Sequence, residues 1–261
     1  MKPTLRRKIQ QFTATVIAAV MLVSITVIPV QAIDTQRRFT DTEIDRWIAT
    51  TSAILNYHNT GIPNLFAQNL RPNIRTQERE RSHNILTGRQ WNIHSQEDLF
   101  MHINSLLVWG HNGSFWDTIY DAAPIMLEIM DDPRVLDEIM WLVSIGELDR
   151  GNVYHVLDTW DTMLYWGEAG IIAWDMFRVG SLIVWGYLSG LITRAEAREQ
   201  MVPAIHILLH YFDSWEDAIV NYLDGMAYWR GAWDTEVIRR YEEATRLIQM
   251  DPVVFDNRMF E

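Results

Sequence analysis

The feature that most constrains the fold is a run at residues 169–188 that is apolar on almost every side of a helix yet carries two charges. A helix of this kind is either the buried centre of a soluble domain or a membrane span. Its charged residues, Asp175 and Arg178, are three apart and therefore share one helix face. Because an ionisable pair near the middle of a membrane span is costly, the run predicts a buried central helix.

Helix signals on both sides of this run predict an all-α protein. The apolar residues recur at helical spacing, and no segment alternates with the period of a strand. Pro203 predicts a kink in the helix over 195–211. We expect a single compact multi-helix domain of about eight helices around the central apolar helix. Residues with N-cap spacing precede several of these helices: Thr40 with Glu43, Ser95 with Asp98, Ser114, Thr193 with Glu196, and Ser214.

The first 32 residues have the pattern of a secretory signal peptide. A basic start at residues 6–8 precedes an uncharged, mostly apolar segment at 13–28, and Ala32 has the small side chain of a cleavage position. That apolar segment is short for a membrane span, which favours cleavage over a retained anchor. The sequence therefore predicts an exported protein, periplasmic or secreted, with no stable membrane span after cleavage. The expected organisation is a signal peptide at 1–32, an N-terminal helix and irregular connection at 33–73, and a helical domain at 74–261.

The chain beyond the signal peptide is strongly acidic. Residues 1–32 contain four basic residues and no acidic one, so their removal changes the net charge from −12 to −16 and leaves arginine without any lysine. Such a chain repels phosphate backbones and anionic membrane surfaces, and we expect no nucleic-acid partner. The chain has no cysteine, which excludes disulfides, thiol catalysis and Cys-ligated metals.

Two interpretations of Asp175 and Arg178 stay open. The first is a structural ion pair that ties neighbouring helices together, in which loss of one partner costs about 3–5 kcal/mol. The second is a ligand site in which Arg178 binds a carboxylate or a phosphate. His111 lies in a glycine-flanked turn at 110–113, where a histidine is well placed either for function or for capping a helix end.

The sequence contains weak metal-site signals and no cofactor motif. His206 and His210 are four apart, the spacing at which two imidazoles on one helix face share a metal. The glutamate of the zinc-protease helix is missing, so these two are weak candidates and we expect no metal site. No phosphate loop, dinucleotide fingerprint or nucleophile elbow is present, and we expect no cofactor. The twelve tryptophans suit a core, or a cleft that stacks on sugars or peptides.

Residues 86–229 resemble the bacterial family known as domain of unknown function 1266. The motifs that carry the resemblance are Trp91-Asn92-Ile93, Gly110-His111, Ala173-Trp174-Asp175 with Arg178, Trp185-Gly186-Tyr187-Leu188, Ser214-Trp215-Glu216, and Tyr222-Leu223 with Gly225 and Trp229. The family usually has glycine where Asn92 stands. The resemblance implies a compact helical domain and no established activity, and its typical members look cytosolic, so an exported member is a departure.

Two hypotheses about function follow. No complete catalytic set is visible, and a chain rich in arginine and tryptophan suits interfaces, which favours an envelope module that binds a protein partner. The alternative is a small-ligand or glycan-processing enzyme with a site around His111, Asp175 and Arg178, joined by Tyr187 or Trp215. Convergence of these side chains on one open pocket favours the alternative, whereas a sealed and paired cluster favours the first hypothesis.

Overall fold

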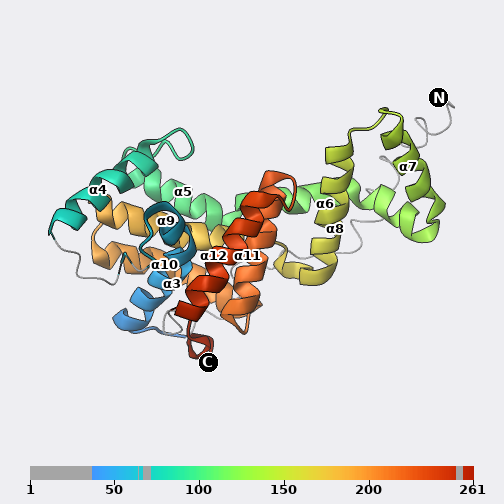
Figure 1. Ribbon diagram of the computed structural model, residues 1–261. Helices are drawn as coiled ribbons and strands as arrows, with labels where there is room; N and C mark the ends of the chain where they lie inside the picture. Colours follow the sequence, from blue (N-terminus) through green and yellow to red (C-terminus); the bar gives the residue numbers. More distant parts are fainter. Residues whose placement is uncertain (1–36, 64, 67–71, 251–254) are drawn as a thin grey trace.

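The computed structural model describes residues 37–63, 65–66, 72–250 and 255–261, and all regular structure in these ranges is helical (Figure 1). The predicted signal peptide lies outside the described residues. The all-α prediction is confirmed. The α-helices are α3 (Asp41–Thr60), α4 (Pro72–Thr87), α5 (Gln96–Val108), α6 (Gly110–Asp131), α7 (Arg134–Ser144), α8 (Arg150–Trp166), α9 (Ile172–Ser189), α10 (Arg194–Tyr211), α11 (Trp215–Arg230) and α12 (Thr235–Met250), with short 3-10 turns η2 (Gly167–Ala169) and η3 (Asn257–Met259).

Side-chain caps fix several helix starts at the predicted positions. Thr40, Ser95, Thr193 and Ser214 each accept a hydrogen bond from a backbone N–H in the first turn of the helix that follows. These bonds satisfy donors that the start of a helix leaves without an intrahelical partner. Pro203 lies inside α10, which continues through it as one helix.

Helix α9 is the predicted central helix. Every residue from Ala173 to Gly186 is buried, and α3, α4, α5, α10 and α11 all pack against α9. The approach to α3 is close at Gly180, where a Cβ atom would overlap with the side chain of Thr51. A larger residue at position 180 would therefore push α3 away from α9.

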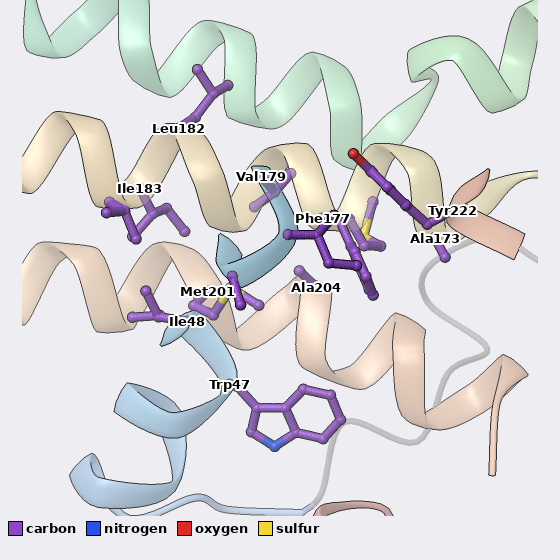
Figure 2. Close-up of a cluster of buried hydrophobic side chains, with 14 of the residues drawn as sticks. Trp47, Ile48, Ala173, Phe177, Val179, Leu182, Ile183, Met201, Ala204 and Tyr222 are labelled. Atoms are coloured by element: carbon purple, nitrogen blue, oxygen red, sulfur yellow. The ribbon is translucent and has the colours of Figure 1, made fainter. Parts of the chain in front are cut away.

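The core around α9 is built mainly from aliphatic side chains, with several aromatic rings packed among them (Figure 2). The rings of Phe177 and Tyr222 stack with their centroids 5.1 Å apart. The rings of Trp47 and Trp215 are tilted relative to each other, and their centroids are 4.8 Å apart. Full burial of a large apolar side chain contributes about 1.5–3 kcal/mol to stability. Because Trp47 belongs to α3, the N-terminal helix shares its core with α9, α10 and α11.

Helices α6, α7 and α8, residues 110–166, extend from the α9 bundle as an arm (Figure 1). A second apolar cluster joins α6 to α8 and includes Phe115, Trp116 and Trp160. The expected helix start at Ser114 was wrong, because α6 begins at Gly110 and Ser114 lies within it. The cap that allows this earlier start comes from α9.

Among the residues that the structure describes, no individual helix has the length and apolar composition to cross a membrane. One pair of segments, Arg150–Ala169 and Ile172–Ser189, reaches that length and composition only when taken together, and it is bent by 72°.

Candidate functional site

The starts of α6 and α9 cap each other. The side chain of Asp175 in α9 accepts the backbone N–H of His111 at 3.1 Å and that of Asn112 at 2.8 Å. In return, the side chain of Asn112 accepts the backbone N–H of Ile171 at 2.7 Å. Helix α6 has no side-chain cap from its own N-cap residue. The fully buried carboxylate of Asp175 caps α6 instead. It lies at the N-terminal end of the helix, where the helix dipole stabilises negative charge.

Helix α11 completes this arrangement through one amide side chain. Asn221 accepts the backbone N–H of Ala173 at 2.9 Å and donates to the carbonyl of Gly170 at 2.8 Å. Both bonds are buried, so their loss would leave backbone groups without partners. Hydrogen bonds between side chains and backbone groups therefore link α6, α9 and α11 at one point.

Arg178 lies one turn beyond Asp175 on α9 and extends the cluster. Its Nη1 donates to Nδ1 of His111 at 2.6 Å and lies 3.7 Å from Oδ1 of Asp175. Because a guanidinium only donates, the ring proton of His111 is on Nε2. The Arg178 guanidinium also lies over the rings of Trp91, at 4.7 Å, and Trp174, at 5.3 Å. Burial lowers the pKa of Arg178, and the carboxylate of Asp175 opposes that shift.

A cavity of about 540 Å³ lies beside Arg178, and we call it the arginine cavity. Its walls come from helices α3, α4, α9, α11 and α12 and from residues 88–91, which follow α4. Arg178 from α9 and Arg240 from α12 both line it, and their exposed fractions are only 8% and 5%. The indole N–H groups of Trp174 and Trp185 are buried without an acceptor in the described part of the chain. The aromatic side chains of the walls are Trp91, Trp174, Trp185, Tyr222 and Trp229.

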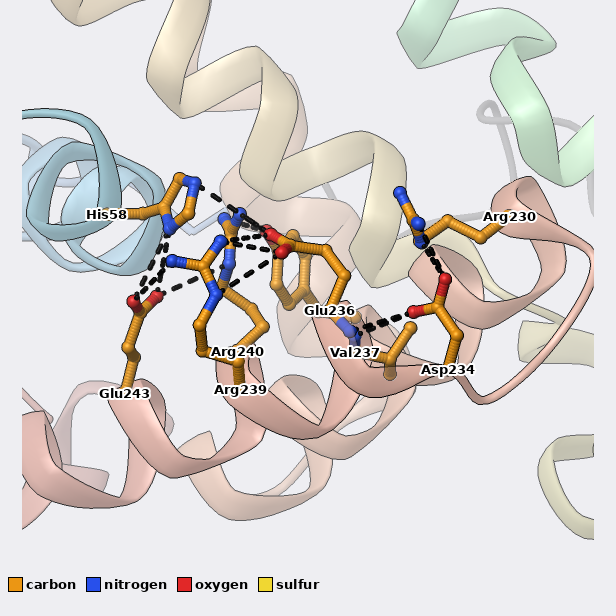
Figure 3. Close-up of polar contacts among 9 residues, drawn as sticks. His58, Arg230, Asp234, Glu236, Val237, Arg239, Arg240 and Glu243 are labelled. Carbon is orange, nitrogen blue, oxygen red and sulfur yellow. Dashed lines mark hydrogen bonds and ion pairs between the residues drawn. The ribbon is translucent and has the colours of Figure 1, made fainter.

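The guanidinium of Arg240 makes long hydrogen bonds and ion pairs with its neighbours (Figure 3). Its Nη1 donates to the hydroxyl of Tyr222 at 3.5 Å, and its Nη2 donates to Oε1 of Glu236 at 3.4 Å. Its Nε lies 3.5 Å from Oε2 of Glu243. These distances are at the long end of the hydrogen-bond range, so the guanidinium keeps donor capacity for a ligand.

His58 of α3 lines the same cavity and contacts the same two acids. Its Nδ1 lies 3.2 Å from Oε2 of Glu243, and its Nε2 lies 3.9 Å from Oε1 of Glu236. Burial lowers the pKa of His58 and the charge of Arg240 lowers it further, although Glu243 opposes the shift. The imidazole of His58 is therefore uncharged at neutral pH.

We expect mild acid to destabilise the folded chain partly through His58. Its folded pKa lies below the ordinary value of 6.5, so the unfolded chain takes up this proton first as the pH falls. Stability that is present above pH 6.5 is therefore lost as the pH falls towards the folded pKa. Urea unfolding at about pH 7.5 and about pH 5.5 should show a smaller loss for His58→Gln than for the wild type. His210 is exposed, so His210→Gln should lose as much stability between the two pH values as the wild type does. If all three proteins lose the same unfolding free energy, His58 does not cause the loss in acid.

The structure brings three predicted site residues together and separates two. His111, Asp175 and Arg178 form one cluster, which we call the cap cluster, and Arg178 alone among them also lines the arginine cavity. Tyr187 is half-buried further along α9, outside the lining of this cavity. Trp215 is fully buried in the core, also outside the lining.

The two histidines of α10 have different surroundings. His206 is buried with its ring 5.2 Å from that of Phe39, whereas His210 is exposed beside Tyr211. Within the described ranges, no group of three or more His, Cys, Asp or Glu side chains is placed to hold a metal ion.

The contribution of α12 to the cavity is not predicted from the sequence. Val237, Arg240, Ala244 and Leu247 are the buried residues of this helix, and they follow a spacing of three, four and three. Arginine is rarely buried without a partner, so an arginine within such an apolar stripe marks a buried cation. This apolar stripe around Arg240 is the sequence signal for the buried cation.

Asn92 adopts a backbone conformation that favours glycine. Its φ of 53° is the only positive value for a non-glycine residue in the part of the chain that the structure describes. Asparagine tolerates this left-handed region better than most residues. The turn before Ile93 is therefore formed with asparagine where the family that it resembles usually has glycine.

Comparison with known proteins gives a family and relatives without a described activity. A family model described as "Protein of unknown function (DUF1266)" matches residues 88–253. The "Uncharacterized protein YbeU" of Escherichia coli (strain K12) is 28% identical over 174 residues, which cover 66% of this chain and 67% of that protein. The "Uncharacterized protein YbeR" of the same organism is 24% identical over 148 residues, which cover 55% of this chain and 57% of that protein. No solved structure matches significantly. The family match includes the cap cluster and both buried arginines of the cavity, but not His58.

Proposed function

The chain belongs to the DUF1266 family of proteins of unknown function, and from that premise we propose that it binds a small organic anion in the arginine cavity. One observation carries the proposal: two buried arginines, Arg178 and Arg240, come from different helices to one cavity. A buried charge is costly unless it is fully paired and hydrogen-bonded. Within the described residues, the one hydrogen bond of the Arg178 guanidinium is to His111, so most of its five N–H donors are left for an anion.

The charge of the cavity differs from that of the chain. Although the whole chain has a net charge of −12, cationic side chains outnumber acidic ones on the cavity walls. A positive cavity in a negative protein attracts anions and concentrates them at one place. The charged groups of the lining are Arg89, Arg178, Arg230, Arg240 and Glu236.

The cavity walls also favour a ligand of a particular shape. A planar guanidinium matches the geometry of a carboxylate or a phosphate, which accepts two parallel hydrogen bonds. The indole of Trp229, which lines the cavity and is 47% exposed, provides flat apolar surface for a planar body. A cavity of about 540 Å³ has the volume of a small-molecule site. The proposed ligand is therefore a flat organic carboxylate or phosphate.

Isothermal titration calorimetry with phenyl phosphate tests this proposal. We expect a Kd of about 1 mM or tighter, as befits a probe of this size, and weaker binding of inorganic phosphate, which lacks the ring. Benzyl alcohol, which has the ring without the charge, should not bind measurably. Arg240→Gln should weaken the binding of phenyl phosphate by about tenfold or more, because it removes a charged donor.

Arg239→Gln provides the matched control. Arg239 pairs with the same two acids, Glu236 and Glu243, but does not line the cavity. This variant should keep the wild-type Kd to within about twofold. Equal weakening by the two substitutions, or no binding of either anion by the wild type, would overturn the proposal.

We also propose that this binding takes place outside the cytoplasm. The basis is the signal-peptide pattern of residues 1–32, which implies a mature chain that begins at Ile33. N-terminal sequencing of the protein recovered from a periplasmic or culture fraction tests this location, and an intact Met1 in the cytoplasmic fraction would overturn it.

A further inference from the structure

We infer that the arm formed by α6, α7 and α8 binds an amphipathic helix with a basic polar face, presented by a partner protein. The binding surface is an apolar groove of about 380 Å³ between these three helices, which we call the arm groove. No residue of the arm groove lines the arginine cavity, so this inference does not rest on anion binding. Side chains from all three helices form its apolar floor, including Met126, Ile129, Leu136, Ile139, Val156 and Leu157.

The apolar side of α7 is only partly covered by the chain itself. None of the residues of α7 is buried, although Leu136, Ile139 and Leu142 all line the groove. An apolar surface that remains open in a groove marks a binding site for the apolar surface of a partner. A groove bounded by helices accepts another helix, whose apolar residues at i, i+3, i+4 and i+7 enter it.

The charge around the groove defines the polar face of that partner. Glu128, Glu138 and Asp149 line the groove itself. Residues 110–166 contain eleven Asp or Glu residues and two Arg, of which Arg134 is paired with Asp132 at 2.7 Å. This negative field favours lysine and arginine on the incoming helix. It disfavours a second copy of this acidic chain and an anionic lipid surface, because both would be repelled.

A designed peptide supplies the probe. A fluorescein-labelled peptide of about 18 residues, five helical turns, carries leucine on one face and lysine on the other. We expect fluorescence anisotropy at about 50 mM salt to give a Kd of about 10 μM or tighter with the full chain. A leucine–glutamate peptide of the same pattern should not bind. Oligolysine of equal charge, and a peptide of the same composition with alternating leucine and lysine, should each bind at least about tenfold more weakly. Equal binding of oligolysine or of the alternating peptide would overturn the inference.

Two neighbouring acids of α7 locate the binding surface. Glu138 lines the groove, whereas Asp137 is exposed on the same helix outside it. We expect Glu138→Arg to weaken peptide binding about fivefold or more and Asp137→Arg to change it by less than about twofold. Both positions are exposed, so neither substitution disturbs a core. Equal effects of the two reversals would overturn the arm groove as the site. Arg240→Gln should leave peptide binding unchanged, which separates this result from that of the arginine cavity.

Discussion

Asp175→Ala is expected to lower the free energy of unfolding by about 3–5 kcal/mol, the cost of breaking a buried charged pair. The substitution removes the acceptor of two backbone N–H groups at the start of α6. It also leaves the buried guanidinium of Arg178 without its neighbouring carboxylate. Urea unfolding followed by circular dichroism measures this loss.

Asp98→Ala is the matched control for this result. Asp98 also accepts two backbone N–H bonds at a helix start, from His94 and Ser95, both at 3.0 Å, but these bonds are exposed. Loss of these exposed bonds costs much less than loss of buried ones, because water replaces the missing acceptor. If Asp175→Ala costs no more than Asp98→Ala, the mutual capping of α6 and α9 does not hold the fold together.

Gly110→Ala is expected to destabilise the fold by about 3 kcal/mol or more, through two effects that add. The backbone of Gly110 has a φ of 55°, a left-handed conformation that costs a residue with a Cβ roughly 1–2 kcal/mol. In addition, the new methyl group would overlap with the carboxylate of Asp175. The cap of α6 would have to move, so its hydrogen bonds would be lost as well.

Gly146→Ala separates the two effects. Gly146 has a φ of 76°, and nothing lies within 4 Å of the position that its Cβ would occupy. The substitution should therefore cost only the backbone strain, roughly 1–2 kcal/mol. Equal unfolding free energies of the two variants would contradict the close contact between Gly110 and Asp175.

The central helix was predictable because its signal is local. A long apolar run that contains Asp175 and Arg178 specifies burial whatever packs against it. The partners of these two charges were not predictable, since the main partners of Asp175 are backbone N–H groups 63 and 64 residues earlier in the chain. Backbone partners leave no pattern in the side-chain sequence. For the same reason Ser114 was assigned as a cap, although the cap of α6 is supplied by another helix.

The candidate site was predictable only in part. Arg178 was identified from its position in the apolar helix, and the structure assigns it to both the cap cluster and the cavity. Arg240 and His58 join it only through the packing of α3, α9 and α12, which no spacing within one helix encodes. The motif around Trp215 suggests a residue of the binding site, but Trp215 packs in the core beside Trp47. A sequence motif thus shows that a position is constrained, but it does not show whether the residue packs in the core or binds a ligand.

A crystal structure of the protein with phenyl phosphate tests anion binding most directly. We predict that the phosphate lies within hydrogen-bond distance of the guanidinium groups of both Arg178 and Arg240, with the phenyl ring against the indole of Trp229 in the same cavity. A phosphate held only by arginines outside the cavity, such as Arg246, with the arginine cavity unoccupied by the probe, would contradict the account.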